Sequence, residues 1–357
     1  MGAWSVTLGL PALHHRRPAA AERTARPLPP ALPPPPCAPA PSPPGSWQAG
    51  VDLLLDGVAP AYGAPGYLSD VARTLRRLRG DGIDSLIVNV PIYQDDLSAS
   101  VVHTGPATPS DALLAGVVGM AERCGMRVAL RPLMQEQPFA GKARSQIVPA
   151  DVRGWFASYR ALVQRYARLA QRWGVEAFIV GTEFDSMQRD VAGWEAVIGD
   201  VRAVFHGRVG YSSNAGDRPY GELMDVPFWD SLDFIGADTY PLIPAADGNE
   251  ESMTSWLTGW YGQLHQAAVR IGKPLVVTET GVIPRQGAYT RPSRWASSAP
   301  LDAGEQAAYY AATCQAARPV VQGIYWWAVR PDPASEPPGG FEPLGQPAEA
   351  ELRACST

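Results

Sequence analysis

Lysine, histidine and cysteine are scarce in this sequence of 357 residues, and their scarcity limits the chemistry it can support. Lysine occurs only twice, which leaves few candidates for a Schiff-base enzyme. The five histidines are scattered and do not suggest a metal cage. The cysteines contain no C-x-x-C pair and form no dense cluster, so neither a disulfide framework nor a structural zinc site is expected; they are Cys37, Cys124, Cys314 and Cys355. The sequence therefore predicts no metal and no cofactor.

Several longer patterns are also missing. No run of eighteen apolar residues occurs, so no transmembrane helix is expected. No G-x-G-x-x-G follows the first apolar run, and no G-x-S-x-G is present, which argues against a dinucleotide site and a serine hydrolase. The formal net charge is −5, with +3 on the first 46 residues and −8 on the rest. An acidic body argues against nucleic acid as a partner.

Proline dominates one stretch near the N-terminus. Residues 27–44 contain 11 prolines in 18 positions, a composition that excludes helix and sheet and favours an extended linker. We therefore predict that residues 1–45 form a disordered tail. In a secretory signal, basic residues precede the apolar core, whereas here they follow the apolar stretch. This order argues against a signal peptide, which is kept as the alternative to a tail. We expect an extracytoplasmic protein, secreted, periplasmic or at the cell surface, with the cytoplasm as the alternative.

From residue 46 to residue 357, short apolar runs alternate with amphipathic helical stretches about eight times. Apolar strands separated by helices predict a parallel sheet covered by helices. Eight such units favour a closed barrel over an open sheet, so the predicted fold class is α/β, a (β/α)8 TIM barrel forming one domain. The predicted strands are 51–55, 83–92, 126–134, 175–183, 207–214, 232–240, 274–280 and 321–329.

Reactive side chains gather at the predicted carboxyl ends of these strands, where such a barrel carries its active site. The fourth strand ends at Glu183, with Asp185 just beyond, and the seventh ends at Glu279. Further candidates for substrate binding are Tyr93, Arg131, Tyr211, Asn214, Asp238, Tyr240, Trp326 and Trp327. Because adjacent strand residues point to opposite faces, only one of the two tryptophans should face the barrel interior.

Two glutamates facing each other across a barrel mouth suit double displacement at a sugar's anomeric carbon. One carboxylic acid protonates the leaving oxygen while the other carboxylate attacks the sugar. A single glutamate after a strand is as readily a carboxylate held by a neighbouring arginine. The presence of Glu183 and Glu279 at these two strand ends favours catalysis.

The segments GTEFDSM, YSSNAG, FWDSLDFIGADTYPL, PLVVTETGV and YWWAV together resemble barrel glycosidases of clan A. More narrowly, the chain resembles glycoside hydrolase family 113 and the related barrel domain of gene-transfer-agent proteins. The resemblance implies that Glu183 is the acid and base, that Glu279 is the nucleophile, and that β-1,4-mannan or a related β-glycan is the substrate. Many clan A enzymes have asparagine before the acid, whereas this chain has Thr182. The usual contact to the sugar 2-hydroxyl must then come from elsewhere, with Asn214 or Arg131 as candidates.

Other barrel reactions fit less well. A class I aldolase needs a lysine at a strand end, but Lys273 precedes the seventh strand and Lys142 lies in a predicted loop. An enolase-type barrel needs several carboxylates on adjacent middle strands, and the fifth strand has none. The serious alternative is an inactive carbohydrate-binding barrel acting in cell-surface attachment or assembly, against which the presence of both glutamates argues. We expect a monomer that acts on a polysaccharide or oligosaccharide.

Overall fold

The structure is a computed structural model that describes Cys37 and residues 47–55, 66–244, 248–331 and 339–357. The predicted tail, residues 1–45, lies outside the described residues except for Cys37. Its disorder, and the domain boundary at residue 46, stay predictions.

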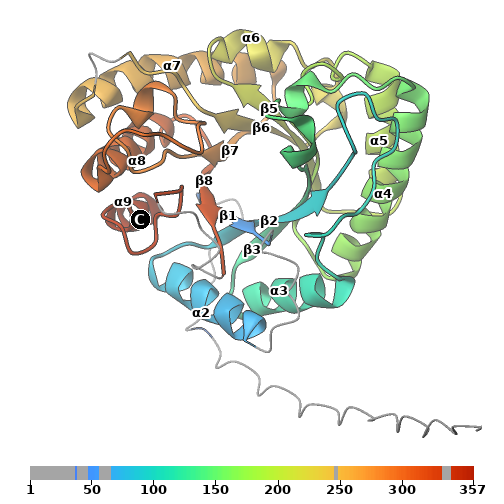
Figure 1. The fold of residues 1–357 in the computed structure, drawn as a ribbon, viewed down its shortest axis with the longest axis horizontal. Helices are drawn as coiled ribbons and strands as arrows, with labels where there is room; N and C mark the ends of the chain where they lie inside the picture. Colours follow the sequence, from blue (N-terminus) through green and yellow to red (C-terminus); the bar gives the residue numbers. More distant parts are fainter. Residues whose placement is uncertain (1–36, 38–46, 56–65, 245–247, 332–338) are drawn as a thin grey trace, which may run out of the picture. The chain divides into compact units, whose positions relative to one another are not determined.

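Eight parallel strands form a closed barrel in which each strand pairs with its neighbours in sequence order and β8 pairs with β1 (Figure 1). This confirms the predicted (β/α)8 class, and each predicted strand is present within a few residues of its expected bounds. The strands are β1 (Gln48–Leu54), β2 (Ser85–Ile92), β3 (Arg127–Met134), β4 (Ala177–Thr182), β5 (Arg208–Ala215), β6 (Phe234–Thr239), β7 (Leu275–Thr280) and β8 (Gly323–Val329).

Helices surround the strands as an outer ring (Figure 1). Several begin at an Asp, Asn or Ser whose side chain accepts a hydrogen bond from the first turn, as Asp151 does before α4. The helices are α2 (Tyr67–Gly80), α3 (Asp111–Arg123), α4 (Val152–Arg172), α5 (Val191–Arg202), α6 (Pro219–Met224), α7 (Glu250–Ile271), α8 (Ala303–Ala317) and α9 (Ala348–Ser356). The short α6 lacks an apolar repeat and was not predicted.

Large side chains fill the barrel near the amino ends of the strands. The rings of Tyr325 and Phe234 lie over Gly50 and Gly210, where a Cβ atom would collide with them. These rings join aliphatic residues from β2, β4 and β7 in one buried layer. Because this end is packed, the opening lies at the carboxyl ends of the strands.

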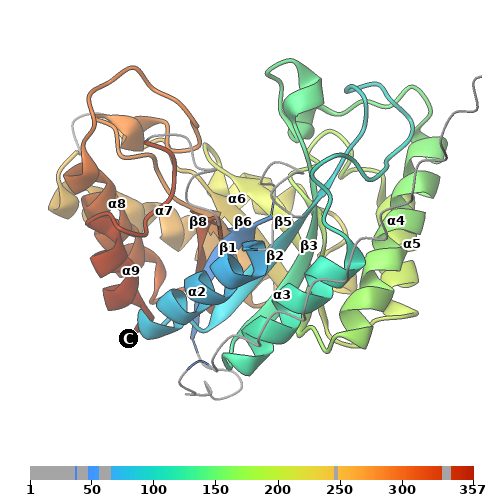
Figure 2. The same ribbon diagram turned by 60° about the horizontal axis from the view of Figure 1, so that its bottom comes forward.

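Loops rise above the carboxyl ends of the strands on two opposite sides. Figure 2 shows the segments after β2 and β3 on one side and the segment after β7 on the other. The loop after β2 is tied to the loop after β3 because the amides of Val148 and Ala150 donate to the carbonyls of Leu97 and Ser98. These loops form walls around the open end of the barrel.

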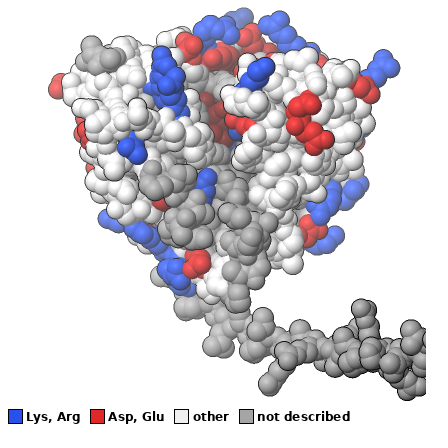
Figure 3. Space-filling model, in the orientation of Figure 1, with Lys and Arg blue, Asp and Glu red and all other residues white. Residues whose placement is uncertain are grey.

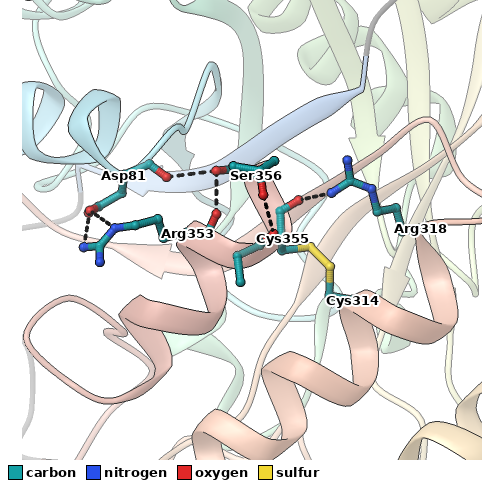
Figure 4. Close-up of a disulfide and its surroundings, with 8 residues drawn as sticks. Asp81, Cys314, Arg318, Arg353, Cys355 and Ser356 are labelled. Atoms are coloured by element: carbon teal, nitrogen blue, oxygen red, sulfur yellow. Dashed lines mark hydrogen bonds and ion pairs between the residues drawn. A yellow bond between two sulfur atoms is a disulfide. The ribbon is translucent and has the colours of Figure 1, made fainter.

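The last helix is fastened to the ring by a disulfide between Cys314 of α8 and Cys355 of α9 (Figure 4). Arg318 donates a hydrogen bond to the carbonyl of Cys355 at 2.6 Å. On the other side of α9, the hydroxyl of Ser356 donates to the carbonyl of Asp81, which follows α2. The helix α9 therefore joins α8 to α2 and closes the outer ring.

A second disulfide joins Cys37 to Cys124, the residue that follows α3. The sequence predicted no disulfide framework, and it did not reveal that all four cysteines are paired in two disulfides. The two paired cysteines are 87 residues apart in one disulfide and 41 in the other, so no local sequence pattern indicates the pairing. The pairing depends on how the helices pack, which the spacing alone does not reveal. No helix among the described residues is both long and apolar enough to cross a membrane.

Candidate active site

A cavity of about 460 Å³ opens at the carboxyl ends of the strands and contains both predicted glutamates, Glu183 and Glu279. Figure 3, which views the face seen in Figure 1, shows Asp and Glu side chains gathered in a hollow near its centre. Residues from the ends of β4 to β8 line the cavity, together with loops after β3 and β7. Among the described residues that line the cavity, Arg144 is the only arginine or lysine.

Glu183 follows β4 in a left-handed backbone conformation, with φ of 55°. Such a conformation costs a non-glycine residue about 1–3 kcal/mol, so the surroundings must hold it in place. The amide of Glu183 donates to the carbonyl of Ser212, and the amide of Phe184 donates to the hydroxyl of Tyr211, both at 2.9 Å. These two bonds to β5 turn the Glu183 side chain toward the cavity.

The electrostatic surroundings of Glu183 favour its protonated form. Its side chain is 15% exposed, and burial raises its pKa to about 8, an effect that Arg144 opposes and Glu279 reinforces. Nε of Arg144 lies 3.8 Å from Oε2 of Glu183 and 3.0 Å from Glu136. At neutral pH Glu183 therefore carries a proton that it can donate.

Glu279 lies in β7 with only 4% of the residue exposed, and a guanidinium and a phenol hydroxyl contact its carboxylate. Nη2 of Arg131 lies 2.9 Å from Oε1 of Glu279, and the hydroxyl of Tyr240 donates to Oε2 at 3.1 Å. A buried carboxylate needs such a cation and such a donor to stay charged. The two glutamates therefore differ in environment, as acid and nucleophile must.

Arg131 is fully buried beneath the cavity and is held by side chains that the sequence did not point to. It donates to Asp52 of β1 at 2.5 Å and to Asn89 of β2 at 2.7 Å. Asn89 also donates to Asp52 at 2.9 Å, so the three groups form one network. A charged or amide residue inside an otherwise apolar strand was the signal that could have revealed Asp52 and Asn89.

Asp238 of β6 also lines the cavity and is 1% exposed. One carboxylate oxygen each from Glu183, Asp238 and Glu279 lie within 4.8 Å of one another. Three such oxygens could hold a cation, but the guanidinium of Arg131 already places positive charge beside Glu279. The sequence-based expectation that no metal binds stays a prediction.

Three further residues predicted from the sequence lie at the cavity: Asn214, Tyr240 and Trp327. Asn214 donates to Asp185 at 2.9 Å, so its amide is already engaged by a neighbour. Trp327 lies edge-on to Trp295 of the loop after β7, with 5.9 Å between ring centroids. Trp327 is thus the tryptophan that faces inward, as one of the two was predicted to do.

Four predicted substrate contacts lie elsewhere. Trp326 stacks on Tyr310 of α8, with centroids 4.1 Å apart, and faces the helices. Tyr211 is fully buried beside Trp194 of α5. Tyr93 pairs with His103 outside the cavity lining, and Arg131 lies beneath the cavity with no exposed surface. Their positions do not support direct contact with substrate, although Tyr211 and Arg131 hold the two glutamates.

The loops contribute cavity residues that strand patterns could not reveal. Arg144 reaches Glu183 because Glu136 binds both its backbone amide and its side chain. Trp295 is 45% exposed and contacts Phe341, with 4.9 Å between ring centroids. Neither the GKARSQ segment nor the residues around Trp295 carry a recognisable motif.

A closed (β/α)8 barrel with two glutamates facing one cavity from β4 and β7 is the architecture of barrel glycosidases. The model of Glycoside Hydrolase Family 113 matches residues 66–334. The chain belongs to glycoside hydrolase family 113 and is a glycoside hydrolase.

Solved structures share this fold. A family 113 β-1,4-mannanase in complex is 23% identical with a TM-score of 0.75, covering 87% of this chain and 99% of its own. The family 113 β-mannanase of Alicyclobacillus acidocaldarius is 24% identical with a TM-score of 0.72, covering 87% and 97%. The endo-1,4-β-D-mannanase of Thermotoga petrophila RKU-1 is 14% identical with a TM-score of 0.60, covering 87% and 99%. No curated protein matches the sequence.

Proposed function

We propose that this glycoside hydrolase cleaves β-1,4-mannan or a related β-glycan with retention of anomeric configuration. In this proposal Glu183 is the acid and base, and Glu279 is the nucleophile. Asn214, Asp238, Tyr240 and Trp327 are the proposed substrate contacts, since each lines the same cavity.

The separation of the two glutamates is the observation that carries this proposal. Carboxylate oxygens of Glu183 and Glu279 lie within 4.8 Å of each other. Retaining glycosidases hold their two carboxyl groups about 5–5.5 Å apart, whereas inverting enzymes need about 6.5–9.5 Å to admit a water. The short separation leaves room for the anomeric carbon but not for a water between sugar and base.

The two environments assign the roles. In the first step an oxygen of Glu279 bonds to the anomeric carbon, the glycosidic carbon–oxygen bond breaks, and the leaving oxygen takes the proton of Glu183. In the second step Glu183 accepts a proton from water, whose oxygen bonds to the anomeric carbon as Glu279 leaves. Arg131 and Tyr240 stabilise the Glu279 carboxylate before attack and after release.

The substrate class rests on the related solved structures, which are described as β-1,4-mannanases. The open cavity and its aromatic wall of Trp295 and Trp327 suit a neutral sugar chain. A reducing-sugar screen over mannan, glucomannan, cellulose, xylan, chitin and peptidoglycan tests this choice. Release of reducing sugar from mannan or glucomannan supports mannan as the substrate, whereas preference for any of the other four rejects mannan and leaves a related β-glycan as the substrate.

The roles of the glutamates are tested with Glu183→Ala and Glu279→Ala. An aryl glycoside with a good leaving group, such as dinitrophenyl, needs little protonation. Glu183→Ala should therefore still form the glycosyl-enzyme, and azide should speed its release as the β-glycosyl azide. Glu279→Ala should be inactive on good and poor leaving groups alike, although azide can give the α-azide.

Identical behaviour of the two variants would overturn the assignment. Proton NMR of the wild-type reaction supplies an independent check, because retention requires that the β-anomer appears first. An inverted first product would reject double displacement even if both glutamates proved essential.

The alternative of an inactive carbohydrate-binding barrel makes a different prediction. Such a protein would be retained on a mannan column but would release no reducing ends.

The two disulfides support an extracytoplasmic location, since structural disulfides persist in oxidising compartments. Thiol counting on protein from a reducing cytosol and from the culture medium would test that location.

A further inference from the structure

We propose that Asp238 is a substrate-binding residue that donates a hydrogen bond from Oδ2 to the 2-hydroxyl of the sugar at the cleavage point. This inference rests on the proposed function and adds a residue to its machinery. It also supplies a replacement for the asparagine of many clan A enzymes, because Thr182, which stands at that position, does not line the cavity.

The hydrogen bonds around Asp238 fix which oxygen can carry a proton. The hydroxyl of Ser212 donates to Thr278, and the hydroxyl of Thr278 donates to Oδ1 of Asp238 at 2.7 Å. Oδ1 is therefore an acceptor. Oδ2 is buried and has no hydrogen-bond partner among the described residues, although Asp238 lines the cavity. A buried polar atom without a partner costs free energy until a ligand satisfies it.

The charges facing Asp238 favour the protonated, hydrogen-bond-donating form. Burial raises the pKa of Asp238 well above its ordinary value, and Glu279 of β7 and Glu183 after β4 raise it further. Arg131 of β3, with Nη1 3.8 Å from Oδ1, opposes this rise, as does the bond from Thr278. The net shift of the Asp238 pKa is upward, which favours a protonated carboxyl that can donate a hydrogen bond.

Geometry selects the 2-hydroxyl as the acceptor. Asp238 pairs with Glu279 across β6 and β7, and their oxygens and that of Glu183 lie within 4.8 Å of one another. A sugar carbon attacked by Glu279 has three oxygens nearby: the glycosidic oxygen, the ring oxygen and the 2-hydroxyl. Glu183 takes the first. The ring oxygen gains positive charge in the oxocarbenium-like transition state, so a donor there would oppose the reaction.

The two residues that the sequence suggested for this contact are engaged elsewhere. Arg131 has no exposed surface and bonds to Asp52, Asn89 and Glu279. Asn214 donates its amide to Asp185. Asp238, in contrast, lines the cavity beside Glu279 and has a carboxyl oxygen without a hydrogen-bond partner among the described residues.

The experiment pairs two variants with two substrates. The variants are Asp238→Ala and Asp238→Asn, with exposed Asp230→Asn as the control for exchanging a carboxyl for an amide. The substrates are an aryl β-mannoside, of the chain length that the enzyme accepts, and its analogue without the 2-hydroxyl on the sugar that carries the aryl group. The deoxy analogue is the same compound for the manno and gluco series, so the test does not depend on which sugar is preferred.

We expect Asp238→Ala to lower kcat/KM on the hydroxylated substrate about 100-fold, as loss of one preorganised donor does. On the deoxy substrate the same variant should match the wild type, because the group it contacts is absent. Asp238→Asn keeps an acceptor for Thr278 and a donor for the sugar, so it should retain most of the wild-type activity. Asp230→Asn should be unchanged on both substrates.

Three results would overturn the inference. An equal loss of kcat/KM for Asp238→Ala on both substrates would mean that Asp238 does not contact the 2-hydroxyl and acts only through Glu279. Loss of activity in folded Asp238→Asn, to the level of the alanine variant, would mean that an ionised acceptor is needed. Absence of any wild-type turnover would reject the proposed function itself and this inference with it, whereas the first two results leave the proposed function intact.

Discussion

The hydroxyl oxygen of Tyr211 lies 2.9 Å from the backbone nitrogen of Phe184, the residue that follows Glu183. Tyr211 thus stabilises the left-handed turn at Glu183 from outside the barrel, although it does not itself line the cavity. Tyr211→Phe should leave the Phe184 amide buried and unpaired, which costs about 1–3 kcal/mol. We expect a lower free energy of unfolding by urea and a lower kcat with KM little changed.

Tyr309→Phe is the control variant, because it removes another buried hydroxyl, on α8. It shows whether the effect of Tyr211→Phe comes from the position of Glu183 or from the loss of any buried hydroxyl. Its contact to Thr280 is long, at 3.5 Å, and lies far from the Glu183 turn in sequence. If both phenylalanine variants lower stability while neither lowers kcat, the Tyr211 hydroxyl does not position Glu183.

The pH dependence of kcat/KM on mannan should show a basic limb with an apparent pKa of about 8, the pKa to which burial raises Glu183. In its proposed role as the acid, Glu183 holds the proton for the leaving oxygen below that pH and has lost this proton above it. Arg144 lowers this pKa, so Arg144→Met should move the basic limb to higher pH. Glu136, the other partner of Arg144, is 35% exposed and can be solvated by water after the substitution.

A dinitrophenyl glycoside is the internal control for this pH effect, since it needs no proton from Glu183 and the limb should vanish. A limb that moves to lower pH in Arg144→Met, or one that persists with the activated substrate, would contradict the assignment of Glu183 as the acid.

Trp327 and Trp326 are adjacent in β8 but should respond differently to substitution. Trp326 is 2% exposed and stacks on Tyr310, so Trp326→Ala should lower the free energy of unfolding by about 3–5 kcal/mol. Trp327 lines the cavity, so Trp327→Ala should lower the free energy of unfolding less than Trp326→Ala does. Its loss of kcat/KM should be far larger than this loss of stability explains. Urea unfolding and mannan hydrolysis, measured on both variants, check this. A full loss of turnover in folded Trp326→Ala would reverse the assignment.

Most of the fold was predictable because every strand, and every helix except α6, has a local sequence pattern. Apolar runs of strand length alternate with helical repeats, and parallel pairing follows from that alternation. The ends of β4 and β7 were equally readable, since a buried strand that runs into Glu183 or Glu279 places a carboxylate at a known edge of the barrel.

The remaining site residues depend on strand parity and loop paths. Tyr211 and Asn214 are three residues apart on one strand, so they point to opposite faces and could not both reach the cavity. The alternation of side chains along a strand also predicted that only one of Trp326 and Trp327 faces inward. It did not predict which of the two does so. Arg144 reaches the cavity only because its loop folds onto Glu136, a tertiary contact with no sequence pattern.

Removal of divalent cations should leave activity unchanged. The carboxylates of Glu183, Asp238 and Glu279 have the spacing of a cation site, but Arg131 already supplies positive charge at 2.9 Å from Glu279. Dialysis against EDTA, followed by addition of Ca²⁺, Mg²⁺ or Mn²⁺, should therefore give equal rates on mannan. A loss of activity that one of these ions restores would show that the carboxylates hold a metal.

The two disulfides should contribute separately to stability. Cys314–Cys355 joins positions 41 residues apart, and a crosslink of that length stabilises the folded state by about 4 kcal/mol if it acts on the entropy of the unfolded chain. Cys37–Cys124 spans 87 residues and should contribute a similar amount. The paired serine variants of each disulfide should lower the free energy of unfolding by up to that value while leaving the cavity intact.

Truncations at the N-terminus separate the role of Cys37 from that of the proline-rich tail. Deletion of residues 1–36 keeps Cys37 and should change neither melting temperature nor mannan hydrolysis. Deletion of residues 1–46 removes Cys37 and should lower the melting temperature as much as Cys37→Ser does, because both lose the same crosslink to Cys124. A large drop already on deletion of residues 1–36 would show that the tail itself stabilises the barrel. Equal stability of the two truncations would show that the crosslink contributes nothing.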